Sequence, residues 1–193
     1  MAVSFRCRCG GLRGEVDIER AYARATCYCT DCRAFARVLG AEAVLDAAGG
    51  TDIVPIVPAA LHIRSGLGHL ACLSLTEAGL LRWYADCCRM PLANTPRSAS
   101  VAYAGVLSDA LDVAPGALEA RLGARGRTVI NAKSATSPVK STPLTLAIGG
   151  LRIALGVTRA RLRGERDSVF FDAQGQPVRE PRVLSKDERA ALD

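Results

Sequence analysis

The first residues of the chain alternate between apolar and polar side chains, which is the pattern of a strand with one buried face. Within residues 3–9 this alternation places Cys7 and Cys9 on the same face. A pair of glycines then indicates a turn, and residues 15–18 have the pattern of a returning strand. The start of the chain is therefore predicted to be a β-hairpin that carries two thiols near its tip.

Short apolar runs follow at intervals of about ten residues, and turns separate them. Several short strands at this spacing are typical of a sandwich or barrel-like sheet, so we expect a mainly β fold. The predicted strands cover residues 52–57, 60–64, 70–75, 81–85 and 101–107.

Four stretches have signals for helices instead of strands. In residues 32–39, three apolar side chains recur at helical spacing. Residues 142–163 form a basic, amphipathic candidate that two adjacent glycines near its centre could bend. A capping box opens the short helix that is predicted over residues 186–192, and one more short helix is expected at residues 115–122.

Composition divides the 193 residues into a β domain over residues 1–110 and a basic, partly helical extension over residues 111–193. The chain has 25 Lys and Arg against 19 Asp and Glu, a net charge of +6. Residues 121–163 contain nine of these basic residues and no acidic ones. Such a segment attracts phosphates, carboxylates, nucleic acid or acidic lipids, although a solubilising surface explains it equally well.

The sequence predicts that the protein is in a compartment where its thiols stay reduced. The first residues lack a charged region followed by an apolar run, so no signal peptide is expected. The longest apolar stretch, residues 143–157, is interrupted by Arg152 and is shorter than the roughly 20 residues that span a bilayer. We therefore expect a cytoplasmic protein without a membrane span, in which clustered cysteines are metal ligands rather than disulfides.

Seven of the eight cysteines fall into three tight clusters, a density that indicates metal binding rather than packing. Zinc is the usual metal for thiolates; its structural sites have four protein ligands, and its catalytic sites have three and an open position. We expect one or two zinc ions per chain. The seven thiols divide into a four-ligand set, Cys7, Cys9, Cys87 and Cys88, and a three-ligand set, Cys27, Cys29 and Cys32.

The adjacent pair Cys87 and Cys88 raises a geometrical difficulty, because neighbouring residues of a strand point to opposite faces. Both can bind one ion only if the backbone turns there; otherwise one is free or serves the other site. The three-ligand set could also be closed by a fourth residue, such as Cys87, His62 or His69. The isolated Cys72 is expected to be a small buried apolar residue.

Three motifs occur in an order that resembles the glutathione-dependent formaldehyde-activating enzyme family, which includes centromere-protein-V-like proteins. They are Cys-x-Cys-Gly-Gly at residues 7–11, Cys-x-Cys-x-x-Cys-Arg at residues 27–33, and an aromatic strand leading to Cys-x-x-Pro-Leu at residues 83–92. The resemblance covers roughly residues 3–110. It implies a β-rich, Mss4-like fold with a structural zinc whose ligands include Cys7, Cys9 and Cys88.

The same resemblance implies a catalytic zinc on Cys27, Cys29 and Cys32. The reaction it implies is a carbon–sulfur lyase step that joins glutathione to formaldehyde. The chain departs from the family pattern at the late motif, where Ala85 replaces the first cysteine and Arg89 replaces a glycine.

Two functions follow from these patterns. As an enzyme or thiol carrier, the protein would bind glutathione or another small thiol, with Arg33 and Asn94 as candidate substrate-binding residues. As a non-catalytic, zinc-stabilised module, it would bind nucleic acid or another acidic partner through its basic segment. No aromatic residue lies between Tyr103 and Phe170, which disfavours base stacking but leaves non-specific phosphate binding open. A metal-free redox protein ranks last, and the sequence does not define the oligomeric state.

Overall fold

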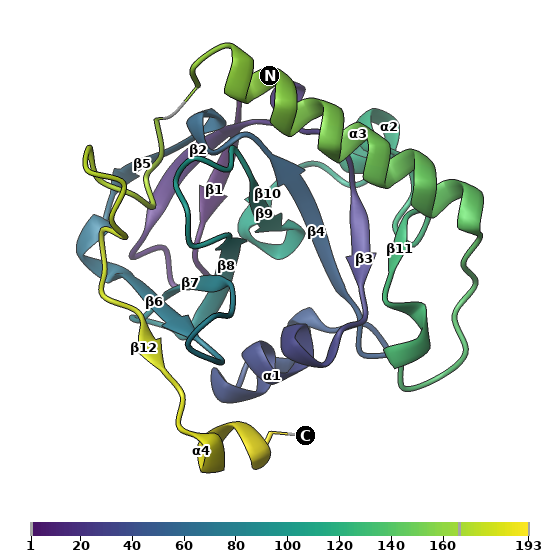
Figure 1. Ribbon diagram of the computed structural model, residues 1–193, viewed down its shortest axis with the longest axis horizontal. Coiled ribbons are helices and arrows are strands. Elements are labelled where there is room, and N and C mark those ends of the chain that lie inside the picture. Colours follow the sequence, from purple (N-terminus) through teal and green to yellow (C-terminus); the bar gives the residue numbers. More distant parts are fainter. Residues whose placement is uncertain (1, 166, 193) are drawn as a thin grey trace.

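The computed structural model describes residues 2–165 and 167–192, and its strands form two sheets (Figure 1). The smaller sheet has four strands in the order β10-β1-β2-β5. The predicted hairpin is confirmed, because β1 and β2 pair as antiparallel neighbours with Val3 and Phe5 facing the core. The bounds are β1 (Ala2–Arg6), β2 (Arg13–Asp17), β5 (Leu61–Ser65) and β10 (Leu111–Asp112).

The larger sheet has eight strands in the order β11-β3-β4-β9-β8-β7-β6-β12. Its central strands β4 and β8 are buried along their whole length, so their sequences do not alternate. The mainly β fold expected from the sequence is confirmed. The bounds are β3 (Ala25–Cys27), β4 (Thr51–Ile56), β6 (Leu70–Ser74), β7 (Leu81–Ala85), β8 (Met90–Thr95), β9 (Ala104–Leu107), β11 (Val129–Ile130) and β12 (Arg182–Val183).

The described residues form four α-helices, which lie around the sheets. Figure 1 shows the longest, α3, along one side of the molecule, and α1 and α4 toward the opposite side. Helix α3 runs through both of its central glycines without a break. Helix α4 begins with the predicted capping box. The bounds are α1 (Thr30–Val38), α2 (Ala117–Leu122), α3 (Pro143–Leu162) and α4 (Lys186–Ala190).

Residues after position 110 are part of the same packed structure. They supply β10 to the smaller sheet, and β11 and β12 to the two edges of the larger one. The ring of Phe170 packs against Trp83 in the main core, with ring centroids 4.9 Å apart. The indole N–H of Trp83 donates to the hydroxyl of Thr95 at 3.0 Å, which satisfies the polar atom of this buried ring. Among the described residues, no helix is long and apolar enough to cross a membrane.

Candidate metal centres

Four cysteines from two distant turns form the four-sulfur centre, which is Cys7, Cys9, Cys87 and Cys88. Cys7 and Cys9 lie in the turn between β1 and β2, and the other two lie in the turn between β7 and β8. The Sγ atom of Cys7 is 3.5 Å from that of Cys9 and 3.7 Å from that of Cys87. A zinc ion bound tetrahedrally at about 2.3 Å holds its thiolates about 3.8 Å apart, so this arrangement fits a closed zinc site.

The turn between β7 and β8 removes the difficulty of two adjacent cysteine ligands. Strand β7 ends at Ala85, which is fully buried in the core, and β8 begins at Met90. Between them Arg89 has a φ of 53°, a left-handed conformation that tightens the turn. Both Cys87 and Cys88 therefore reach the centre, although Ala85 stands where the resembled family has a cysteine.

A side chain at Gly11 would be in tight contact with two sulfurs of this centre. A Cβ atom at this position would lie 3.2 Å from the Sγ of Cys87 and 3.4 Å from that of Cys9. The second glycine of the Cys-x-Cys-Gly-Gly motif thus lets the backbone approach the sulfurs closely.

Local hydrogen bonds favour the thiolate form of Cys7. Burial works against its charged form, but hydrogen bonds from the backbone N–H of Leu12 and from Cys9 and Cys87 lower its pKa to about 7. Burial and hydrogen bonds with Cys9 and Cys7 raise the pKa of Cys87. Without metal, the negative charge is therefore concentrated on Cys7, and a divalent cation would allow further thiols to ionise.

Three cysteines at the start of α1 form the three-sulfur centre, which is Cys27, Cys29 and Cys32. Cys27 ends β3, Cys29 is the N-cap of α1, and Cys32 lies in its first turn. The Sγ of Cys29 accepts the backbone N–H of Cys32 at 3.3 Å and is 3.4 Å from the Sγ of Cys27. The helix N-terminus is a site that favours thiolate over thiol.

Hydrogen bonds among these sulfurs give the three thiols different pKa values. Those from Cys27 and Cys32 hold the pKa of Cys29 well below its usual range. The bond with Cys29, together with burial, raises the pKa of Cys27, and the bonds with Cys27 and Cys29, together with burial, raise the pKa of Cys32. Cys29 is also the least buried of the three, so the thiolate lies on the side of the centre that solvent can reach.

Two polar side chains that sequence reasoning missed contact this centre. The guanidinium of Arg82, which is 2% exposed, donates to the Sγ of Cys32 at 3.8 Å. The amide of Asn131 donates to the Sγ of Cys27 at the same distance. Within residues 2–165 and 167–192, no fourth Cys, His, Asp or Glu ligand atom lies within 4.8 Å of all three sulfurs. The arrangement therefore has three thiol ligands and an open fourth position.

A cavity of about 10 Å³, enough for one water molecule, lies beside Cys32. Asn94 and Arg82 line it, as does Thr51, whose buried hydroxyl has no hydrogen-bond partner among the described residues. A buried polar atom without a partner is costly, so a polar ligand at this position would satisfy the hydroxyl. Asn94, a candidate substrate-binding residue, lines the same cavity as Cys32.

The remaining candidates lie elsewhere or have other partners. Arg33 donates through Nη1 to the carbonyls of Tyr28 and Ser134 at 3.0 and 2.6 Å, which fixes the loop that packs over α1. His69 is next to the four-sulfur centre, where it bonds Asp86 at 3.2 Å. His62 is exposed on β5. Neither histidine joins the three-sulfur centre.

The isolated Cys72 is buried, as expected, and burial raises its pKa to about 12. All eight cysteines are free thiols.

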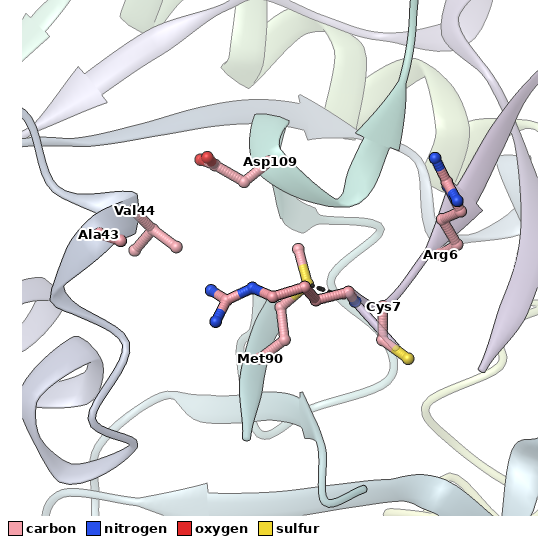
Figure 2. A pocket seen from close by; sticks show the side chains of 7 residues that line it. Arg6, Cys7, Ala43, Val44, Met90 and Asp109 are labelled. Carbon is pink, nitrogen blue, oxygen red and sulfur yellow. Dashed lines mark hydrogen bonds between the residues drawn. The ribbon is translucent and has the colours of Figure 1, made fainter. Parts of the chain in front are cut away.

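A cleft of about 310 Å³ lies on the outer side of the four-sulfur centre, lined by Arg6, Cys7, Arg8, Ala43, Val44, Met90 and Asp109. Figure 2 shows Asp109 and Val44 on different elements around this space, with the sulfur of Cys7 pointing away from both. The cleft therefore borders the hairpin turn that carries Cys7, and the Cys7 sulfur points away from Asp109 and Val44 across it.

The fold and its two cysteine centres define a mainly β protein with one closed and one open candidate metal site. The chain belongs to a family of unknown function, DUF6151, whose match covers residues 1–161. It is also similar to the crystal structure of a Rhodobacter sphaeroides protein, a Northeast Structural Genomics target, at 20% sequence identity and a TM-score of 0.41. That match covers 60% of this chain and 94% of the other. No curated protein matches the chain.

Proposed function

We propose that this protein binds two zinc ions and that its three-sulfur centre binds the sulfur of a small thiol such as glutathione, for carbon–sulfur bond chemistry with an aldehyde. The observation that carries the proposal is a set of three thiols, without a fourth ligand among the described residues, beside a cavity with an unpartnered hydroxyl. Three protein ligands and an open position are the pattern of a catalytic zinc site. The motif order shared with the formaldehyde-activating family supports glutathione as the thiol.

The proposed reaction is an addition that needs no oxidant. The thiolate sulfur forms a bond to the aldehyde carbon, the C=O π electrons move to the oxygen, and the oxygen takes a proton from water. In the reverse direction, the hydroxyl loses its proton and the carbon–sulfur bond breaks. Zinc, when bound, would lower the pKa of the incoming thiol and so supply the thiolate at neutral pH.

The residues of the chain contribute positioning and charge. The buried guanidinium of Arg82 provides a positive potential next to the sulfurs, which favours the anionic form of a bound thiol. Because the cavity on the side of Cys32 admits only one water, a tripeptide would approach from the more exposed side of Cys29. Thiols that bind zinc must stay reduced, so the proposal includes a cytoplasmic location.

Native mass spectrometry of reduced protein tests this function by counting zinc and glutathione per chain. Two zinc ions and one glutathione are expected for the wild type. Cys29→Ser should lose one zinc and the glutathione adduct, whereas Cys72→Ala, a change at a thiol outside both centres, should keep all three. S-methylglutathione, which cannot form a thiolate, should not bind. An adduct that survives in Cys29→Ser, or a two-zinc protein without any adduct, would disprove the proposed thiol site.

A further inference from the structure

Helix α3 has apolar side chains on both its faces, but the described part of the chain covers only one of them. Its inner face uses small residues: a Cβ at Gly149 would lie 2.4 Å from Thr128, and one at Gly156 would lie 2.2 Å from Tyr22. Ala160 is buried on the same face. A leucine would not fit at these close approaches, so the helix cannot rotate to bury its larger side chains.

The outer face carries a row of large aliphatic side chains, which we call the outer stripe, and Thr158 and Arg159 separate its last member from the others. At about 100° per residue, its members fall within about 40° of one line along the helix, which is about 30 Å long. They are 43–83% exposed, whereas such side chains are usually scattered singly on a protein surface. The outer stripe consists of Leu144, Ile148, Leu151, Leu155 and Leu162.

Arginines border the outer stripe. Arg152 and Arg159 lie about 60–80° from its centre line on one side, and Arg161 lies on the other. These three side chains are exposed and form no ion pair with the described residues. No Asp or Glu occurs anywhere in residues 121–163. The surface therefore combines an apolar strip with arginines at its edges, and acidic residues follow only after the end of the helix, at Glu165 and Asp167.

We infer that α3 lies flat on an anionic lipid surface, with the outer stripe inserted between the headgroups and its arginines contacting lipid phosphates. A bilayer interface offers apolar and anionic groups at adjacent depths, which matches both parts of this surface. The inference does not rest on the zinc chemistry proposed above.

Two other occupants match only one part of the surface. A nucleic acid would pair with the arginines but leave five aliphatic side chains without an apolar partner. A second copy of the chain would cover the stripe but bring together two basic helices with no acidic residue between them. The charge and the apolar row together favour the lipid surface.

Vesicle flotation with full-length, zinc-loaded protein tests the inference at about 0.1 M salt, where charges act over about 10 Å. We expect the protein to float with vesicles of phosphatidylcholine and phosphatidylglycerol in equal parts, and to bind pure phosphatidylcholine about tenfold more weakly. Binding should also weaken at about 1 M salt, because the arginine contribution is screened.

The outer stripe is tested by the double variant Leu151→Glu/Leu155→Glu. Both side chains are more than half exposed, so the fold should survive, and binding to the anionic vesicles should fall about tenfold or more. The matched control is Leu67→Glu/Leu80→Glu, which makes the same charge change at two exposed leucines far from α3 in the sequence. The control should bind within about twofold of wild type, and zinc content should be unchanged in both.

Three results would overturn the inference. The first is an equal loss of vesicle binding in the two double variants, or no binding by the wild type. The second is a wild-type dimer in light scattering that Leu151→Glu/Leu155→Glu dissociates, with no vesicle binding, which would identify a second copy as the partner. The third is tight binding of an oligonucleotide that competes with vesicles and persists in that variant. None of them would change the outcome of the zinc and glutathione experiment.

Discussion

Arg24 and Asp52 form a buried ion pair that joins the segment before β3 to β4. The side chains are 7% and 0% exposed, and two guanidinium nitrogens of Arg24 donate to the Oδ2 atom of Asp52, at 2.7 and 3.0 Å. Removing one partner would leave the other charge buried without compensation. We expect Asp52→Asn to lower the free energy of unfolding by about 3–5 kcal/mol, measured by urea denaturation.

Glu119 provides a matched control, because it contacts the same arginine from outside. It bonds Nη1 of Arg24 at 2.8 Å, but its side chain is 47% exposed. Glu119→Gln should change the free energy of unfolding by about 1 kcal/mol or less, as exposed ion pairs do. If the two variants have the same stability, burial does not determine the contribution of this pair.

At the residue scale, the sequence predicts the cysteine ligands but not the residues that surround them. The division of seven thiols into four and three could be predicted, because the thiols fall into two pairs and one trio in the sequence and the counts match zinc chemistry. Arg82 and Thr51 come from β7 and β4, and Asn131 follows β11. These residues approach the three-sulfur centre only through strand pairing, which no local pattern encodes, although a charge inside the apolar run at residues 81–85 was a signal for Arg82.

At the scale of elements, the packing of helix α3 against the rest of the protein requires glycine at some positions and not at others. A Cβ at Gly156 would overlap the ring of Tyr22, and this ring is fixed because its hydroxyl donates to the carbonyl of Ala102 at 2.8 Å. Gly156→Ala must therefore displace the helix or the ring. We expect it to lower the free energy of unfolding by about 1–3 kcal/mol, measured by urea denaturation monitored by circular dichroism.

The same substitution at Gly150 should have the opposite sign. No heavy atom outside its own helical turn and chain neighbours lies within 4 Å of a Cβ at that position. Gly150→Ala should raise the free energy of unfolding by about 0.5–1 kcal/mol, because alanine is the better helix former. Two changes of equal sign would show that α3 does not pack as described.

The predicted strands and helices were recovered where a local pattern was strong. The one central strand of full length that was missed, β8, contains Pro91, and proline argues against a central strand. The structure accommodates it at a register shift in the pairing of β7 and β8, where Tyr84 lies opposite Pro91. Strands β10, β11 and β12 have two residues each, too few for any periodicity.

In the whole molecule, the four-sulfur centre connects the two sheets. Cys7 and Cys9 follow β1 of the smaller sheet, and Cys87 and Cys88 follow β7 of the larger one. The two pairs are about 80 residues apart in sequence, whereas the three-sulfur centre spans six residues next to one helix. A bound zinc at the first centre would therefore close a long loop of the unfolded chain, and at the second only a short one.

Because the two centres close loops of different length, we expect the loss of each metal site to lower the stability of the protein by a different amount. By loop-closure entropy alone, a cross-link over about 80 residues contributes about 4–5 kcal/mol, and one over about six residues about half as much. Cys87→Ser/Cys88→Ser and Cys29→Ser each leave two thiols at their centre and should each lose one zinc, but the double variant should lower the melting temperature more. For a chain of this size the difference should be about 5–10 °C, measured by calorimetry on zinc-loaded proteins.

A zinc chelator provides the control, since it should bring wild type and both variants toward the same low melting temperature. Excess zinc should restore the wild type alone, because each variant has lost a ligand. Equal melting temperatures in the two zinc-loaded variants would contradict a cross-linking role for the four-sulfur centre. A larger loss in Cys29→Ser would mean that the three-sulfur centre holds the fold together. The three-sulfur centre would then be a structural site, and its open position would not bind a thiol substrate.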